Sequence, residues 1–155
     1  MKKIAGIGII VVLVDQILKL LVSSTMPLNA SKEIISNFFN ISLVHNDGAA
    51  WSILSGNRLL LIVISLIALI LIYFLFVKGK QLTSLDILTY GILMGGIVGN
   101  LLDRIIHGYV VDFLDFRLLG YNYPVFNFAD CCIVIAACLL IFDVLKEGLL
   151  CKKSL

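Results

Sequence analysis

The segment PVFNFADCCIVIAACLLIF (residues 124–142) decides the class of fold, because its apolar run is long enough to lie in lipid. Asp130 stands at the head of this run, and Asn127 lies one helical turn earlier. An amide and an acid three residues apart are typical of a helix N-cap. A carboxylate at this position is equally suited to catalysis at a membrane surface. The rest of the chain has to decide between these interpretations.

The composition of the whole chain is that of an integral membrane protein. Hydrophobic residues make up 61% of its 155 residues and charged residues only 14%, and the mean hydropathy is +1.09. Soluble globular domains are far more polar. A helix that crosses a bilayer needs roughly 20 mostly apolar residues. The chain therefore has room for about four spans and two sizeable connections.

We predict an integral membrane, mainly α-helical fold that forms a single membrane domain over residues 1–155. Only helices and closed barrels satisfy the backbone in lipid, and the long apolar runs lack the alternation of barrel strands. The predicted spans cover about residues 4–22, 59–77, 85–106 and 126–145, and the long connections cover residues 23–58 and 107–124.

The distribution of Lys and Arg predicts the orientation. Seven of the twelve cationic residues fall on the side of the termini, namely Lys2, Lys3, Lys78, Lys80, Lys146, Lys152 and Lys153. The other side carries Lys32, Arg58, Arg104 and Arg117. By the positive-inside rule both termini are cytoplasmic and the long connections face outward. The start of the chain also resembles a signal peptide, but Asp15 and Lys19 inside its apolar run favour a retained span.

Cysteine and histidine do not indicate a metal site. The cysteines stand at positions 131, 132, 138 and 151, which is neither a ligand spacing nor a disulfide framework. His45 and His107 form no zinc pattern. No GxSxG motif supports a serine protease. The net charge of +2 is explained by topology, so we expect no nucleic acid partner.

Ionisable groups inside the spans are costly in lipid, so each is a candidate functional residue. Asp15 and Lys19 lie four residues apart on one helix face, and an ion pair between them is the favoured interpretation. Lys19 could alternatively extend toward the outer headgroups.

The third predicted span, which contains GILMGGIVGNLLDR, combines small residues with a polar stripe. Gly95 and Gly99 form a GxxxG pattern, which allows another helix to approach closely. Asn100 and Arg104 follow on one face. A pairing of Arg104 with Asp103, or an anchor at the headgroups, would explain the arginine, but a buried amide at Asn100 needs partners of its own.

Two acidic residues in apolar surroundings border the second connection. Asp112 lies in VVDF and Asp130 in FNFAD. Taken singly, an ion pair with Arg117 explains Asp112, and the helix dipole explains Asp130. Taken together, they indicate a pair brought face to face. Two carboxylates in one partly desolvated site cannot both ionise readily, so the pair can supply a general base and a general acid, as in an aspartic protease.

Five ordered blocks resemble those of the bacterial lipoprotein signal peptidase family, also called signal peptidase II. The blocks are DQILK (15–19), HNDGAAW (45–51), GGIVGNLLDR (95–104), VVDF (110–113) and FNFAD (126–130). The resemblance implies an aspartic endopeptidase of the bacterial cytoplasmic membrane. It would remove signal peptides from diacylglyceryl-modified prolipoproteins, immediately before the lipidated cysteine, without a metal or organic cofactor. We accordingly expect prolipoproteins and membrane lipid as partners, and a monomer.

The resemblance also implies the residues of the site. Asp112 and Asp130 correspond to the catalytic pair. The supporting or substrate-binding residues would be Asn46, Gly48, Ala50, Asn100, Arg104, Asn127, Asp15 and Lys19. The wall of the active site would be shaped by Val110, Phe113 and Ala129.

Beside the four spans, the resemblance implies a small outer β-sheet cradle and a short amphipathic helix. FFNISLVH (38–45) independently favours a strand, because it is rich in aromatic and β-branched residues and alternates imperfectly. LLGYN (118–122) is a candidate for the helix.

Two other classes of membrane protein fit less well. A proton-coupled transporter would hold its carboxylates at mid-bilayer, whereas Asp112 and Asp130 fall at one face. Intramembrane aspartyl proteases of the presenilin or prepilin-peptidase kind would show GxGD, and here HGYVV precedes Asp112.

Overall fold

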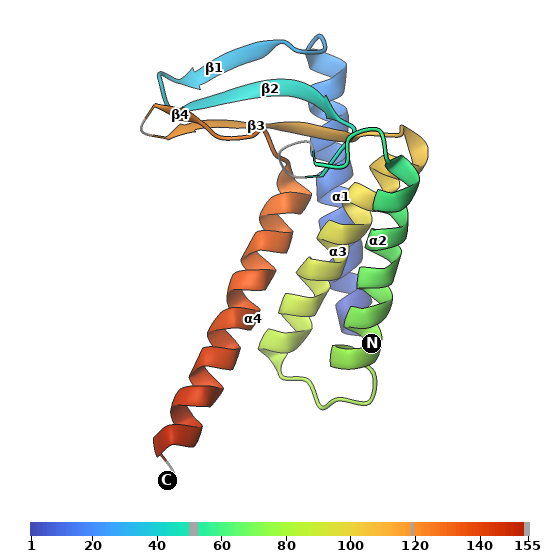
Figure 1. Cartoon of the computed structure of the whole chain (residues 1–155), viewed down its shortest axis with the longest axis vertical. Helices are drawn as coiled ribbons and strands as arrows, with labels where there is room; N and C mark the ends of the chain where they lie inside the picture. The colour runs from blue at the N-terminus through green and yellow to red at the C-terminus, as the bar shows by residue number, and fades with distance from the viewer. Residues whose placement is uncertain (50–52, 119, 154–155) are drawn as a thin grey trace.

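The computed structural model describes residues 1–49, 53–118 and 120–153 and contains four long helices (Figure 1). They are α1 (Lys2–Thr25), α2 (Arg58–Ile72), α3 (Ser84–Ile106) and α4 (Phe128–Lys153), and a π-helical segment, η2 (Tyr73–Val77), continues α2. All four, with α2 and η2 taken as one continuous helix (Arg58–Val77), are long and apolar enough to cross a membrane. They lie over the four segments in which spans were expected, and the mainly α-helical membrane fold is confirmed.

A small antiparallel sheet accounts for most of the two long connections. Its strands are β1 (Ser31–Ile35), β2 (Phe39–Asn46), β3 (Val110–Leu118) and β4 (Tyr121–Asn122), in that spatial order. β2 overlaps the segment predicted as a strand, residues 38–45, with a shift of one residue. The two connections meet in the pairing of β2 with β3, where Val44 lies opposite Asp112.

The prediction of a helix over residues 118–122 is wrong. β3 ends at Leu118 and β4 is Tyr121–Asn122. Gly120 has a φ of 83°, a left-handed conformation that suits a reversal between strands rather than a helix. Within the described residues of the two long connections, strands, bends and turns occur but no amphipathic helix.

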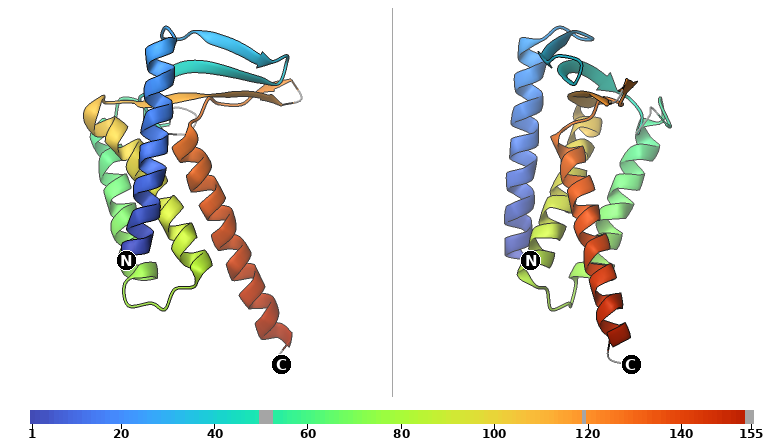
Figure 2. Two further views of the ribbon diagram at one scale, coloured as in Figure 1. Left: turned by 180° about the vertical axis from the view of Figure 1, so that it is seen from behind. Right: turned by 90° about the vertical axis from the view of Figure 1, so that its left-hand side faces the viewer.

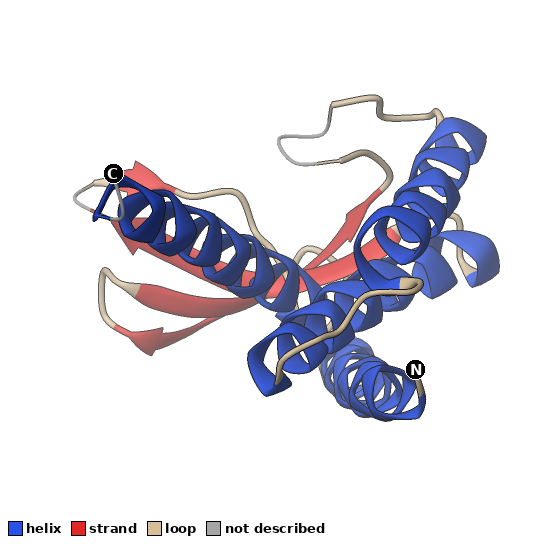
Figure 3. Ribbon diagram, turned by 90° about the horizontal axis from the view of Figure 1, so that it is seen from below, coloured by secondary structure: helices blue, strands red, loops and turns tan. Residues whose placement is uncertain are grey.

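The sheet and the chain termini lie at opposite ends of the bundle. Figure 2 shows both termini, together with the loop between α2 and α3, at the end remote from the strands. α1 rises past the sheet to the level of β1, whereas the other helices end below it. Seen from below, the helices stand in front of the strands (Figure 3).

Helix α3 is central, because it packs against α1, α2 and α4. Its glycines permit the contacts on both sides. A Cβ atom on Gly95 would lie 2.8 Å from the Cβ of Val11 and 2.9 Å from the carbonyl oxygen of Gly8 in α1. A Cβ on Gly96 would lie 2.7 Å from the carbonyl oxygen of Ala129 in α4. The close helix approach predicted at Gly95 is therefore present.

We expect Gly95→Ala to lower the thermal unfolding midpoint of the purified protein in detergent. The added methyl group meets backbone atoms that cannot move aside, and such overpacking costs about 1–3 kcal/mol. Gly6→Ala in α1 is the matched control, because a Cβ there has no neighbour within 4 Å and alanine favours a helix. Equal midpoints for the two variants would contradict the packing described above.

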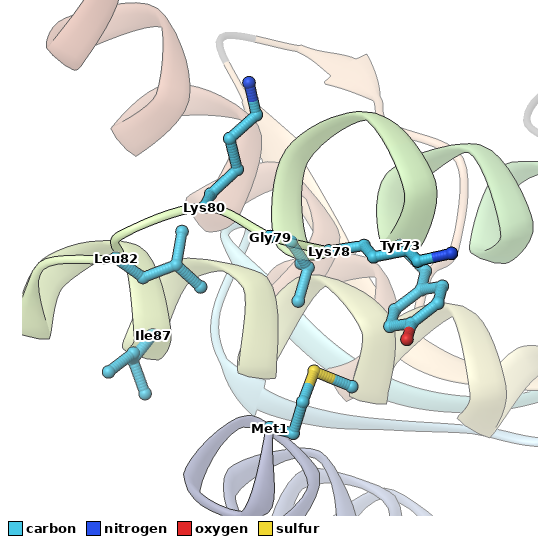
Figure 4. A pocket seen from close by; sticks show the side chains of 8 residues that line it. Met1, Tyr73, Lys78, Gly79, Lys80, Leu82 and Ile87 are labelled. Atoms are coloured by element: carbon cyan, nitrogen blue, oxygen red, sulfur yellow. The ribbon is translucent and has the colours of Figure 1, made fainter.

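A hollow of about 350 Å³ lies where the N-terminus meets the loop between α2 and α3. Figure 4 shows Met1, Tyr73, Lys78 and Lys80 among its lining residues. This is the end of the bundle remote from the sheet. The hollow contains none of the predicted site residues, which gather instead where the strands meet the helices.

Candidate active site

The junction between β3 and the start of α4 brings Asp112 and Asp130 together. Asn127, just before α4, contacts both residues. Its Nδ2 atom donates to Oδ1 of Asp112 at 2.6 Å, and its Oδ1 atom accepts from the backbone N–H of Asp130 at 3.0 Å. One buried amide thus joins the two residues predicted to form a pair.

Asp130 is at the same time part of a helix cap. The N–H of Asn127 donates to Oδ2 of Asp130 at 3.1 Å, which completes a reciprocal capping box. The other carboxylate oxygen accepts from Nδ2 of Asn100 at 2.7 Å. The two interpretations of Asp130 therefore do not exclude each other, because one oxygen serves the helix and the other belongs to the buried polar site.

Asp112 is 3% exposed and is held by amide groups from both sides. Besides Asn127, Nδ2 of Asn46 donates to its Oδ2 at 2.9 Å. Burial raises the pKa of Asp112 from 3.8 to about 7; the charge of Asp130 raises it too, whereas the two amide hydrogen bonds lower it. Asp112 can therefore carry a proton near neutral pH.

The alternative ion pair between Asp112 and Arg117 does not form. Arg117 is exposed, and neither of the ion pairs found in the described part of the chain involves Asp112. Successive side chains of a strand alternate between its faces, so residues five apart point to opposite sides. Phe113 is buried, at 5% exposed, and its part in the wall of the site stays a prediction.

Lys19 lies at the centre of a buried ion cluster. Its Nζ atom is 2.8 Å from Oδ2 of Asp15 and 2.9 Å from Oδ2 of Asp103. The predicted pair of Asp15 and Lys19 is confirmed. The alternative that Lys19 extends to the headgroups is wrong, because it is only 3% exposed and is directed at α3.

Asp103 is a residue of this cluster that the sequence interpretation missed. The sequence suggests for it only a pairing with its neighbour Arg104, yet adjacent helical residues do not face each other. Oδ1 of Asp103 accepts from Nε2 of Gln16 at 2.9 Å, and its Oδ2 accepts from the N–H of Val111 at 3.1 Å. The signal that could have found it is a carboxylate inside an apolar span, which needs buried partners.

Arg104 reaches into the first connection. Its Nη2 atom donates to the carbonyl of Gly48 at 2.9 Å and Nη1 donates to the carbonyl of Asn100 at 3.4 Å. The Nε atom is buried and has no hydrogen-bond partner within the described structure. Arg58 holds the same end of α3, because its guanidinium donates to the carbonyls of Arg104 and Ile105, each at 2.7 Å.

Most of the predicted supporting residues lie in or beside this site. Asn46, Asn100 and Asn127 donate to the two carboxylates, as described. Oδ1 of Asp15 accepts from the N–H of Ala129 at 3.0 Å, which anchors the start of α4 to α1. Ala50 lies outside the described residues.

No cluster of three His, Cys, Asp or Glu side chains suited to a metal occurs in residues 1–49, 53–118 and 120–153 as far as their side chains are described.

The fold and the site define a class of protein. It is a four-helix membrane protein in which two aspartates, each hydrogen-bonded to the same asparagine, lie where a small sheet meets the helices. The chain belongs to the signal peptidase II family, whose model matches residues 7–146. The family predicted from the five sequence blocks is thereby confirmed, and the chain is a membrane protease of this family.

Relatives of known name and solved structures agree with this assignment. The lipoprotein signal peptidases of Staphylococcus aureus strains JH9 and Newman are each 39% identical over 141 residues, which is 91% of this chain and 86% of theirs. A bacterial membrane enzyme solved at 2.3 Å by the in meso method superposes with a TM-score of 0.87 at 36% identity, over 96% of this chain and 90% of that one. A second, at 1.9 Å, has a TM-score of 0.84 at 37% identity, over 95% of each chain.

Proposed function

We propose that this protease removes signal peptides from diacylglyceryl-modified prolipoproteins, immediately before the lipidated cysteine, and that it is an aspartic endopeptidase. The name of the relatives, lipoprotein signal peptidase, supports the substrate class. The observation that carries the catalytic proposal is the junction of Asp112 and Asp130 through Asn127. The enzyme acts as a monomer and needs no metal or organic cofactor.

In the proposed reaction the two carboxylic groups divide the acid–base work. The ionised member takes a proton from a water molecule, and the water oxygen attacks the carbonyl carbon that precedes the lipidated cysteine. The protonated member then gives its proton to the cysteine nitrogen, and the C–N bond breaks. The signal peptide leaves with a new carboxyl group and the lipoprotein with a free amino group. The pair ends with one proton, as it began.

The surrounding polar groups support this chemistry. The amides of Asn46, Asn100 and Asn127 hold the carboxylates in fixed positions. The unpaired Nε of Arg104 is a donor suited to a backbone carbonyl of the substrate, because a buried donor without a partner is costly. Substrate binding would remove that cost.

The product identifies the reaction. Purified protein with a chelator and a diacylglyceryl-modified prolipoprotein should release a fragment whose mass corresponds to cleavage before the lipidated cysteine. A fragment that begins elsewhere would contradict the proposed specificity. Loss of activity in the chelator would show that the reaction needs a metal.

The pH profile of kcat/KM should fall at alkaline pH; this falling part is its alkaline limb. The pair must hold one proton, and Asp112, with its pKa raised by burial to about 7, loses that proton as the pH rises through this value. We therefore expect kcat/KM to fall with an apparent pKa near 7, which belongs to the coupled pair. Asn46→Leu removes a hydrogen bond that lowers the pKa of Asp112, so the limb should move to higher pH. A rate that stays flat from acidic pH to well above neutrality would contradict this.

We place the site on the outer face of the bacterial cytoplasmic membrane, with both termini in the cytoplasm. This agrees with the termini at the end remote from the sheet (Figure 2) and with the excess of Lys at that end. In a variant without native cysteines, Asn122→Cys in β4 should react with an impermeant maleimide in intact cells. Lys80→Cys, in the loop between α2 and α3, should react only after permeabilisation. The reverse pattern would overturn the orientation.

A further inference from the structure

The three asparagines around the carboxylates share one arrangement. Each turns its NH₂ group toward Asp112 or Asp130 and its oxygen toward a group that can only donate. For Asn46 that donor is the N–H of Gly48 at 3.0 Å, and for Asn127 it is the N–H of Asp130. A backbone N–H never accepts a hydrogen bond. The oxygen of each of these two amides must therefore face the N–H, and the NH₂ group must face the carboxylate.

The third amide, Asn100, is oriented by a side chain from another helix. Its Oδ1 atom accepts from Nζ of Lys19 at 2.9 Å, and an ammonium group cannot accept. The oxygen must therefore face α1, and the NH₂ group faces Asp130. If the amide turned over, its oxygen would meet a carboxylate oxygen, and its NH₂ group would meet an ammonium.

All three hydrogens of the Lys19 ammonium group are used by the partners described above. An ammonium has three hydrogens, and the three close oxygens belong to Asp15, Asp103 and Asn100. The cluster also reaches the other carboxylate through the backbone, because Oδ2 of Asp103 accepts from the N–H of Val111, the residue before Asp112.

We propose that Lys19 is a positioning residue of the reaction, which acts by holding Asn100 as a hydrogen-bond donor to Asp130. This inference rests on the proposed function. Lys19 does not touch the reacting atoms; it determines which end of one amide faces the catalytic carboxylate. The charged groups that act on Asp130 are Lys19 and Asp15 from α1, Arg104 from α3 and Asp112 from β3.

The test is a double-mutant cycle on kcat with Lys19→Met and Asn100→Leu. Each single variant should lower kcat by about 10–100-fold, as loss of supporting hydrogen bonds commonly does, while KM changes by less than about threefold. The double variant should be no slower than the slower single one, because both changes remove the same hydrogen bond to Asp130. A residue that merely stabilises the fold would leave the kcat of the folded protein unchanged, and a residue that acts on the reaction independently of Asn100 would give effects that multiply. Lys80→Met, at an exposed position, is the matched control and should keep kcat unchanged.

Lys19→Met leaves Asp15 and Asp103 buried without their cation, which can prevent folding. The second variant therefore combines Lys19→Met with Asp15→Asn and Asp103→Asn, so that the cluster is neutral, and the cycle with Asn100→Leu is repeated in that protein. A folded Lys19 variant with the kcat of the wild type, or effects that multiply with those of Asn100→Leu, would overturn the inference. If Asp112→Asn and Asp130→Asn are also fully active, the proposed function itself fails; if they are inactive, only the role of Lys19 fails.

Discussion

Asp130→Asn is expected to abolish cleavage of a lipidated prolipoprotein, with a loss of at least about 10³-fold in kcat, because one member of an acid–base pair cannot be replaced by an amide. The side chain of Asn has the size of Asp and still offers one oxygen to the N–H of Asn127. The helix cap is therefore kept while the acid–base capacity is lost. Cleavage is measured with purified protein in detergent, after unfolding curves have shown that the variant is folded.

The same helix provides the control for this experiment. Asp143 lies roughly three and a half helical turns beyond Asp130 along α4, and Asp143→Asn should leave the rate nearly unchanged. If Asp130→Asn cleaved at the rate of the wild type, Asp130 would be a helix cap only, and the pairing with Asp112 would have no catalytic meaning.

Removal of the diacylglyceryl group from the substrate is expected to have the second largest effect, a loss of about 100-fold or more in kcat/KM. The polar side chains of the site are engaged with one another, which leaves few groups to read substrate side chains. Aromatic rings lie along the sheet instead, beginning with Phe126, the residue before Asn127: the rings of Phe116 and Phe126 are 5.7 Å apart between centroids, and those of Phe39 and Phe116 are 4.6 Å apart. We therefore expect the diacylglyceryl group, rather than the substrate side chains, to determine which substrates the enzyme cleaves.

In the proposed reaction the lipid would also position the substrate for catalysis. Each buried methylene contributes about 0.8 kcal/mol to membrane affinity, so two acyl chains fix the depth of the cysteine far more firmly than the signal helix alone. A scissile carbonyl held near the carboxylates avoids much of the entropy cost of reaching them. The measurement compares one prolipoprotein with and without its diacylglyceryl group, in the same detergent. Equal rates would contradict selection by lipid.

The helices could be predicted from the sequence, but most of the sheet could not. An apolar run of about 20 residues has few structural alternatives. The segment that forms β3, in contrast, has Asp112 and Asp115 among its apolar residues, and its own pattern does not predict a strand. Its partner β2 is distant in the chain, and the register includes a shift between Ile41 and Val44. A pairing between distant segments depends on tertiary contacts that local sequence patterns do not contain.

Part of the site could likewise be predicted from the sequence, and part could not. The carboxylates and their asparagines could be proposed because they stand in recognisable blocks. The ion cluster could be predicted only as far as one helix extends: Asp15 and Lys19, four residues apart, form the expected pair. The contact of Lys19 with Asp103 joins α1 to α3, and no spacing within a single segment reveals it.

The most direct test of the account is the cleavage of diacylglyceryl-modified prolipoprotein by Asp112→Asn under single-turnover conditions, with enzyme in excess and product detected by mass. Asp112 lies in a strand and caps no helix, so its replacement by Asn keeps the size of the side chain and removes its acid–base capacity. The variant also leaves one of the two amide donors, Asn46 or Asn127, without its acceptor oxygen. The account predicts that the variant folds and binds the substrate but forms no product above the uncatalysed background. Product at the rate of the wild type would contradict the claim that Asp112 and Asp130 are the catalytic pair.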